Sequence, residues 1–203
     1  METAIIHDMP QGSESWHRIR LMKITASNFK TAMSKGVGRG KLQDDLVEEY
    51  LTQKRKESFC TDAMRNGVEL ESEARDEYEF HNGCKVAEVG FVEVSEYIGA
   101  SPDGLVGEHG GLEIKCIIPS TLRKILEGKK KVSDYLPQID GNMWATGRKW
   151  WDLVLYCPEA VKRRYWSTRI PRDELRTAEI DVKINAFAGE LKSRIDKLKK
   201  PTF

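Results

Sequence analysis

Segments with strand character occupy the middle of this 203-residue chain, and segments with helical character lie on both sides of them. The strand-like segments, rich in β-branched and aromatic residues, are 85–94, 97–100, 112–118, 150–157 and 165–170. Apolar residues at helical spacing dominate before this block and after it. The order predicts an α/β (α+β) domain in which helices flank a central mixed β-sheet.

Helical spacing also predicts where the helices begin and end. Ser13 and either Thr25 or Ser27 are expected to cap the first two helices, and Gly83 to end the fourth. Three glycines within residues 35–41 predict a flexible basic loop. No repeat or long linker divides the chain, so residues 1–203 are expected to form one domain. The predicted helices are 13–21, 25–33, 42–56, 62–81, 121–127, 133–146 and 172–199.

Composition excludes some classes of protein and leaves others open. The 33 basic and 32 acidic residues nearly cancel, so total charge does not identify a nucleic-acid binder. No stretch approaches the roughly 18 apolar residues of a membrane span, and Met1 to Pro10 does not resemble a signal peptide. The four scattered cysteines lack zinc or disulfide spacing, which predicts reduced thiols in a cytoplasmic protein.

The most informative motif is the turn Ser101-Pro102-Asp103-Gly104, followed by the strand-like Glu113-Ile114-Lys115. Side chains alternate along a strand, so Glu113 and Lys115 are expected on one face and Ile114 on the other. A hairpin through residues 107–111 would bring Asp103 beside Glu113. Two carboxylates and the Ile114 carbonyl oxygen would then suit Mg²⁺, which prefers oxygen ligands.

Such a site suits phosphodiester hydrolysis, because a metal ion lowers the pKa of bound water and offsets charge that develops on the phosphate. Lys115 would orient the attacking water or pair with the scissile phosphate. The alternative is a surface hairpin whose only feature is a Glu113–Lys115 ion pair. The apolar neighbours Leu112 and Ile114 favour a buried strand and hence the functional interpretation.

Pro102-Asp103 with Glu113-Ile114-Lys115 resembles the signature of the PD-(D/E)xK nuclease superfamily, which implies a restriction-endonuclease-like core. The longer string from Ser101 to Cys116 is similar to the phage lambda exonuclease-like branch, the viral recombinase or alkaline exonucleases. Further blocks of similarity to this branch lie at 16–21, 24–27, 67–75 and 135–144.

The resemblance implies that Asp103, Glu113 and the Ile114 carbonyl hold one Mg²⁺, and that Glu71 and Asp103 hold a second. Mn²⁺ is the alternative ion. A helical ion pair with Arg75, four residues away, is the competing explanation for Glu71. Gln138 aligns with a glutamine of the family's active site, where it would contact phosphate or water.

Three residues align with the family's pocket for a terminal 5′-phosphate: Arg20, Thr25 and Ser27. A guanidinium binds phosphate in a bidentate fork, and amides at a helix start attract anions. The segment with Lys35, Arg39 and Lys41 corresponds to a basic loop expected to contact the DNA backbone. Trp16 is expected either to stack on a base or to pack in the core.

By resemblance, the chain is expected to digest one strand of a linear duplex from its 5′ end, leaving 3′ tails for recombination by strand annealing. The implied partners are DNA ends, a homotrimeric ring and a single-strand annealing recombinase, in the cytoplasm of a bacterial host of a phage or prophage. The alternatives are a restriction-type or junction-resolving endonuclease and a non-catalytic scaffold. The phosphate pocket around Arg20 argues against the endonuclease, and the intact acidic and lysine motif argues against the scaffold.

Overall fold

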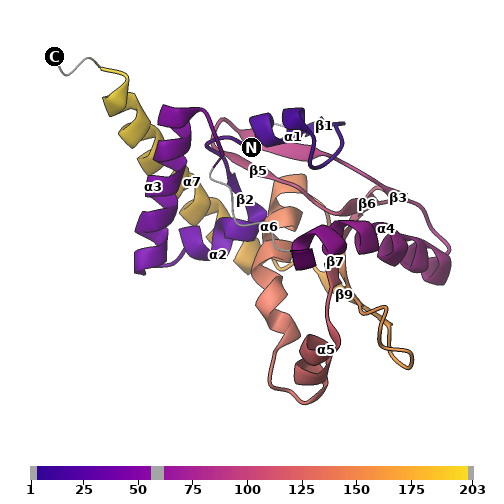
Figure 1. Ribbon diagram of the computed structural model, residues 1–203. Coiled ribbons are helices and arrows are strands. Elements are labelled where there is room, and N and C mark those ends of the chain that lie inside the picture. Colours follow the sequence, from indigo (N-terminus) through magenta and orange to yellow (C-terminus); the bar gives the residue numbers. More distant parts are fainter. Residues whose placement is uncertain (1–3, 56–61, 201–203) are drawn as a thin grey trace.

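The computed structural model of the chain describes residues 4–55 and 62–200, with the side chains of residues 62–69 left out of the description. Helices surround a central group of strands (Figure 1). The strands are β1 (Ile5–His7), β2 (Ile24–Thr25), β3 (Val86–Ala87), β4 (Phe91–Ser95), β5 (Ile98–Ala100), β6 (Gly104–Val106), β7 (Gly110–Cys116), β8 (Trp150–Tyr156) and β9 (Tyr165–Pro171). The helices are α1 (Glu14–Ile19), α2 (Phe29–Ala32), α3 (Val37–Thr52), α4 (Asp62–Asn82), α5 (Pro119–Leu126), α6 (Leu136–Thr146) and α7 (Glu174–Leu198), with 3₁₀ turns at Ala26–Asn28 and Val132–Tyr135.

The strands form two hydrogen-bonded sheets. One has the order β1-β4-β5-β2 and the other the order β3-β6-β7-β8-β9. Both sheets are mixed, because β2 runs parallel to β5 and β7 runs parallel to β8, while the other neighbours are antiparallel. The predicted class, a mixed sheet flanked by helices, is therefore confirmed, with the strands divided between two sheets.

The division arises where one predicted strand is interrupted. The sequence pattern predicts a single strand over residues 85–94, but residues 88–90 are not in strand conformation. Gly90 donates its N–H to the His7 carbonyl, and a Cβ at Gly90 would lie 2.2 Å from the Met9 carbonyl oxygen. The N-terminal segment thus crosses the strand at Gly90. The first half of the predicted strand, β3, consequently pairs with β6, and the second half, β4, pairs with β5.

A second prediction that the structure corrects is the flexible loop at residues 35–41. Residues 37–41 belong to α3, with Gly36 as its N-cap. Arg39 fixes this end of the helix, because its Nε donates to the Ala32 carbonyl at 3.1 Å and its Nη2 pairs with Glu190 of α7 at 2.8 Å. Tertiary contacts therefore outweigh the low helix propensity of glycine here.

Capping predictions have mixed outcomes. The Ser13 hydroxyl accepts the Trp16 N–H and caps α1, and Gly83 follows α4 with a φ of +59°, so both predictions are confirmed. The prediction for Thr25 and Ser27 is wrong: Thr25 precedes a 3₁₀ turn without a side-chain capping bond. The two hydroxyls instead lie 3.1 Å apart and hydrogen-bond to each other.

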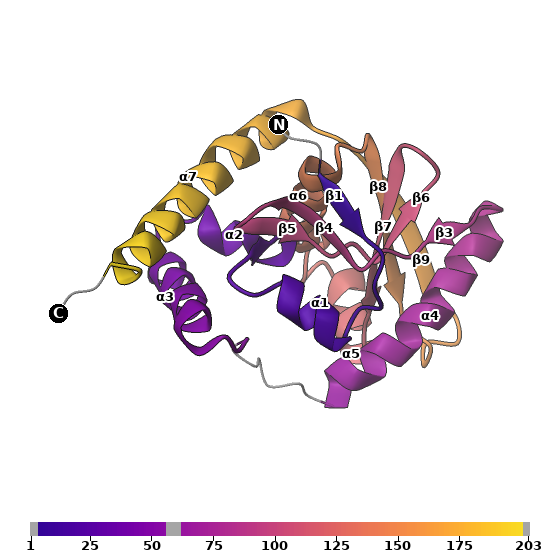
Figure 2. The same cartoon turned by 90° about the horizontal axis from the view of Figure 1, so that it is seen from above.

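Two helices cover opposite faces of the five-stranded sheet. Ala74 and Tyr78 of α4 pack with Leu112 and Ile114 of β7 on one face. On the other face, Ile139 and Met143 of α6 belong to a second buried cluster with side chains of β6 and β8. The long α7 packs against α2, α3 and α6 on the far side of the molecule (Figure 2). Within the described ranges, no helix combines the length and apolar character that crossing a bilayer requires.

Because β4 and β5 lie close together, Gly99 has no room for a larger side chain. A Cβ at Gly99 would lie 2.1 Å from the Phe91 ring and 2.8 Å from the Val92 carbonyl oxygen. We expect Gly99→Ala to lower the free energy of unfolding by about 1–3 kcal/mol through overpacking. Urea denaturation followed by circular dichroism measures this loss.

Gly189 provides the matched control, because it lies within α7 and has open space around its Cα. Gly189→Ala should leave stability unchanged or raise it by up to about 1 kcal/mol, since alanine favours the helix. Equal stability changes for the two variants would contradict the described packing of Gly99.

Candidate active site

The hairpin of β6 and β7 brings Asp103 beside the middle of β7. β6 pairs with β7 only as far as the Gly104–Leu112 pair. Beyond it, the Ile114 N–H donates to Asp103 Oδ2 at 2.6 Å. In a strand the N–H and C=O of one residue point to the same edge, so the Ile114 carbonyl faces this open edge as well. The predicted approach of Asp103 to the Glu113 strand is confirmed.

Glu113 lies at the centre of the site and is fully buried. Its Oε2 accepts a hydrogen bond from Asn142 Nδ2 of α6 at 3.0 Å, and its Oε1 is ion-paired with Lys115 Nζ. Glu113 and Lys115 therefore share the face opposite Ile114, as the alternation predicts. Burial, reinforced by the nearby Asp103 carboxylate, raises the pKa of Glu113 to about 8.

Lys115 remains a cation in this environment. Burial alone would lower the pKa of its ammonium group, but the Glu113 and Asp103 carboxylates outweigh burial and raise it. An amine that holds its proton this firmly is a hydrogen-bond donor and a positive charge, not a free base. This agrees with a role in orienting water or pairing with phosphate.

Glu71 approaches the site from α4. Burial and then the Asp103 carboxylate raise the pKa of Glu71 to about 7, which places the two acids within electrostatic reach of each other. Glu71 Oε1 also lies 3.5 Å from Arg75 Nη2, and Arg75 binds Glu88 at 2.9 Å. Glu71 therefore forms the helical ion pair with Arg75 and also lies near the acidic site, so both interpretations of this residue have support in the structure.

Glu71, Asp103 and Glu113 offer oxygen atoms of the kind that a hard divalent cation prefers. Glu113 Oε1 has no partner other than Lys115 among the described residues, and burial disfavours the charged forms of Glu71, Asp103 and Glu113. No three His, Cys, Asp or Glu side chains in the described part of the chain form a ready-made metal cage. Mg²⁺ does not need one, since it is commonly held by one or two carboxylates, waters and substrate phosphate.

Arg20 lies next to this centre and is held on two sides. Its Nη1 donates to the Ser101 hydroxyl at 2.8 Å, two residues before Asp103, and its guanidinium stacks 3.9 Å above the Trp16 ring. Trp16 in turn donates its indole N–H to the Gly90 carbonyl at 2.9 Å. Burial and the neighbouring Arg55 lower the pKa of Arg20 to about 9, an environment that an anion would relieve.

Thr25 approaches the same strand end, because it pairs with Gly99 where β2 runs parallel to β5. Its hydroxyl is buried and bonds the exposed Ser27. The predicted phosphate-binding residues thus gather near the Ser101 turn. Trp16 is fixed by its bond to Gly90 and its contact with Arg20, which favours a structural role over base stacking.

Several predicted residues make no side-chain hydrogen bond with the groups of this centre within the described part of the chain. Gln138 is half-buried on α6, and no hydrogen bond of its side chain is seen among the described residues. Lys35 and Lys41 are exposed at the start of α3, a helix that packs on α2 and α7 instead of the five-stranded sheet. Arg39 is engaged with Glu190 in this packing.

Asn142 is a residue of the site that sequence reasoning did not identify. It is fully buried and fixes one oxygen of Glu113. The sequence spacing could have indicated it, because Asn142 lies four residues after Gln138, which was predicted to be in the active site, and hence on the same face of α6.

Residues 15–149 match the family described as the YqaJ-like viral recombinase domain. The chain belongs to this family. A comparison with curated protein sequences gives no match.

Two solved structures with extensive similarity contain an alkaline exonuclease, LHK-Exo, from Laribacter hongkongensis. The match has 37% sequence identity and a TM-score of 0.84, and it covers 92% of this chain and 96% of that one. One of the two is a complex with dAMP. A phage-related exonuclease from Haemophilus somnus 129PT has a TM-score of 0.67, 15% identity, and coverage of 87% of this chain and 96% of that one, which shows similarity of fold. These matches support the lambda exonuclease-like branch and the restriction-endonuclease-like fold that the motifs indicated.

The buried carboxylates of this family member predict an unusual dependence of stability on pH. Because burial raises the pKa of Glu113 from 4.5 to about 8, the folded state binds this proton more tightly than the unfolded state. The stabilisation is present below pH 4.5 and is lost as the pH rises toward about 8. In metal-free buffer, urea denaturation should show a free energy of unfolding that falls across this range.

Glu113→Gln should make this dependence weaker, because the amide does not titrate and Glu71, whose pKa is raised to about 7, accounts for the remainder. Glu108→Gln, at an exposed position of the turn before β7, should keep the wild-type profile. A Glu113→Gln profile identical to that of wild type would show that Glu113 does not titrate abnormally.

Proposed function

We propose that this member of the family is a Mg²⁺-dependent exonuclease that hydrolyses one strand of linear duplex DNA in the 5′→3′ direction. The observation that supports this most strongly is the Asp103 carboxylate bound to the Ile114 N–H, beside the buried Glu113–Lys115 pair. Similarity to an alkaline exonuclease over nearly the whole chain supports the same reaction class.

In this proposal, Asp103, Glu113 and the Ile114 carbonyl would hold one Mg²⁺, and Glu71 with Asp103 would hold a second. The bound ions would supply an acidified water and offset negative charge at the phosphate, and Mn²⁺ would be an alternative. Asn142 fixes the orientation of Glu113 through the 3.0 Å hydrogen bond. Lys115, kept protonated by Glu113, would orient the water or pair with the scissile phosphate. Gln138 would contact phosphate or water from α6.

The 5′→3′ direction rests on the cluster around Arg20. The Arg20 guanidinium, held by Ser101 two residues before Asp103, would bind the terminal 5′-phosphate together with the Thr25 and Ser27 hydroxyls. Binding of the strand end beside the acidic centre would direct hydrolysis to that end. An endonuclease has no need of such a pocket.

The product would be a duplex with 3′ single-stranded tails, suited to recombination by strand annealing. We infer from the resemblance a homotrimeric ring around DNA and a single-strand annealing recombinase as partner, in the cytoplasm of a phage-infected or lysogenic bacterium. The dAMP complex of LHK-Exo supports nucleotides as the ligand class of such a site.

The first test compares linear duplexes labelled at the 5′ or the 3′ end with a covalently closed circle. We expect Mg²⁺-dependent release of 5′ label, no reaction in EDTA and no cutting of the circle. Lys115→Ala should lower the rate by about 100-fold or more, because a positioned charge is removed. Its Mg²⁺ binding, measured by calorimetry, should persist because the acids remain.

Lys149→Ala removes an exposed lysine just before β8 and serves as the matched control, with an expected wild-type rate. Glu113→Ala should lose both hydrolysis and Mg²⁺ binding. Cutting of the circle would favour the endonuclease, and a near-normal rate for Lys115→Ala would place the active site elsewhere.

The second test concerns the end chemistry of the DNA. Wild type should digest a 5′-phosphorylated duplex at least about tenfold faster than a 5′-hydroxyl duplex, because a charge-assisted hydrogen bond contributes about 1.5–3 kcal/mol. Arg20→Ala should remove most of this preference by slowing the phosphorylated substrate. Initial rates on both duplexes measure it.

Arg18→Ala is the control on the same helix, since Arg18 is largely exposed and only weakly paired with Glu14. Its preference should equal that of wild type. A wild-type enzyme indifferent to the 5′ end would overturn the pocket assignment.

A further inference from the structure

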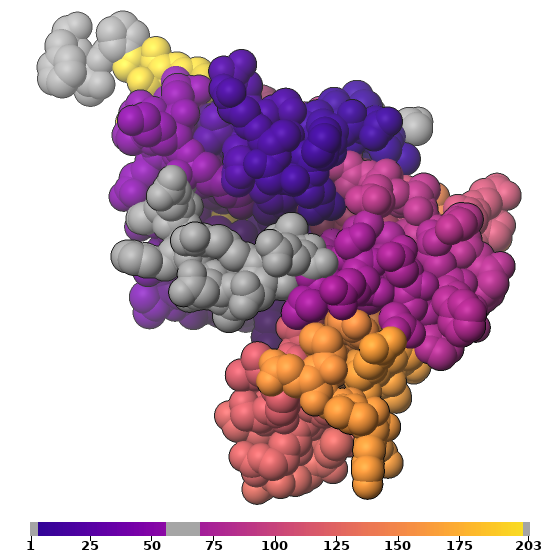
Figure 3. All heavy atoms as spheres, turned by 45° about the vertical axis from the view of Figure 1, so that its right-hand side comes forward, coloured from indigo at the N-terminus to yellow at the C-terminus, as the bar shows by residue number. Residues whose placement is uncertain are grey.

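Two basic turns follow the C-terminal ends of the neighbouring strands β7 and β8 of the five-stranded sheet. β7 and β8 are parallel and in register, with Cys116 opposite Tyr156, so the segments that follow them start side by side. The first segment contains α5 and the turn after it, and the second is the turn between β8 and β9. In the space-filling view, these segments form adjoining lobes at one end of the molecule (Figure 3).

These turns concentrate positive charge that the rest of the chain lacks. Residues 123–131 contain five basic residues and one acid, and residues 158–164 contain three basic residues and one acid. The net charge of the whole chain is only +1, so acids outnumber bases everywhere else taken together. A local excess of this kind is the electrostatic footprint expected of a phosphate-binding surface.

Five of these side chains have no carboxylate partner within the described residues. Glu127 pairs with Arg123 and Lys129, and Glu77 pairs with Arg164. The remaining cations define what we call the strand-end basic surface: Lys124, Lys130, Lys131, Lys162 and Arg163.

The backbone beneath this surface is held in place. After α5, Gly128 has a φ of +70° and the Lys129 N–H donates to the Lys124 carbonyl at 2.8 Å, which closes the turn. Ile125 and Val132 on either side of it pack against the core cluster of α6 and β8. Lys124, Lys130 and Lys131 therefore belong to an anchored segment.

The surface lies close to the proposed catalytic centre. Lys115 is the penultimate residue of β7, at the strand end where both turns begin. The Lys130 ammonium lies 5.4 Å from the centre of the Tyr135 ring, and Tyr135 is within electrostatic reach of Lys115. The basic turn and the acidic site are thus connected through one aromatic side chain.

We propose that the strand-end basic surface binds backbone phosphates of the duplex DNA that extends from the active site. This inference rests on the proposed function and adds the residues that would hold the substrate outside the catalytic centre. Neither turn contains an aromatic residue, so the turns themselves offer no stacking platform for single-stranded bases. Cations without such a platform favour the regularly spaced phosphates of a duplex.

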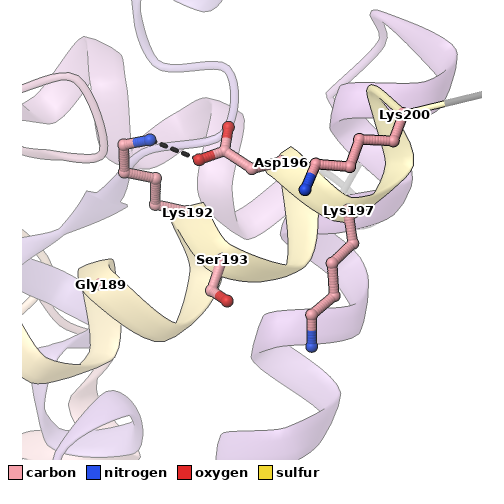
Figure 4. Close-up of a pocket in the computed structure, with 6 residues that line it drawn as sticks. All are labelled: Gly189, Lys192, Ser193, Asp196, Lys197 and Lys200. Atoms are coloured by element: carbon pink, nitrogen blue, oxygen red, sulfur yellow. Dashed lines mark hydrogen bonds and ion pairs between the residues drawn. The ribbon is translucent and has the colours of Figure 1, made fainter.

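The experiment removes one charge from each turn in the double variant Lys131→Gln/Lys162→Gln. Its control, Lys197→Gln/Lys200→Gln, removes two lysines from the C-terminal end of α7, where Lys192 is bonded to Asp196 (Figure 4). That end lies far from α5 in both ribbon views (Figures 1 and 2). Binding to a fluorescent duplex and to a single strand is measured in EDTA over a range of salt concentrations.

We expect the strand-end variant to reduce the slope of log affinity against log salt by about 1–2 for the duplex, because each phosphate that a lysine neutralises contributes about 0.9 to this slope. The control slope should equal that of wild type. In Mg²⁺, the strand-end variant should digest the duplex with a raised KM and a wild-type kcat.

An unchanged slope, an equal reduction in the control, or a larger effect on single strands would each overturn the proposal. A variant with a normal slope but altered subunit association would assign the surface to a protein interface instead. The binding measurement needs no hydrolysis. A wild-type protein that binds duplex through this surface without digesting it would therefore contradict the proposed function alone.

Discussion

The backbone amide of Ile114 has no strand partner on its β6 side, because β6 pairs with β7 only as far as Leu112. An unpaired buried amide is costly, and the Asp103 carboxylate satisfies it at 2.6 Å. This single bond fixes Asp103 against the strand that presents Glu113 and Lys115. It also leaves the Ile114 carbonyl at the same open edge, so the early end of β6 creates the oxygen-rich site.

The remaining groups of the site gain little stability from their own arrangement. Glu113 is fully buried with one hydrogen bond and one lysine partner, and Glu71 and Asp103 add further negative charge nearby. A buried charge needs compensation, and Lys115, with Arg75 beside Glu71, supplies two positive charges for three carboxylates. The packing of α4 and α6 on the sheet must therefore stabilise an arrangement that a bound cation would relieve.

The local part of the site was predictable from sequence, whereas its tertiary supports were not. Strand alternation and a short hairpin are enough to bring Asp103, Glu113 and Lys115 together, since all three lie within thirteen residues. Asn142 reaches Glu113 from a separate helix, and local patterns do not specify such a contact. The motif resemblance also indicated the family and the fold class correctly.

Two predictions made from the sequence were wrong for the same physical reason, which is contact between segments that are distant in the chain. The glycines at 36, 38 and 40 predicted a loop, but Arg39 bonds to Glu190 of α7 and holds the start of α3. The apolar run at 85–94 predicted one strand, but the N-terminal segment crosses it at Gly90. In each case a partner more than eighty residues away decides the local conformation.

The parallel pairing of β7 and β8 connects these features to the charge distribution. Parallel neighbouring strands have their C-terminal ends side by side. The segments that follow β7 and β8 therefore both begin beside the acidic centre. Carboxylates at that edge suit cations, and the lysines and arginine of the following turns suit anions. A phosphodiester substrate presents anionic oxygens, which positive groups near the scissile bond would offset. Opposite charges near one strand end, with the Tyr135 ring beside Lys130 and Lys115 paired with Glu113, can therefore act on one nucleic acid.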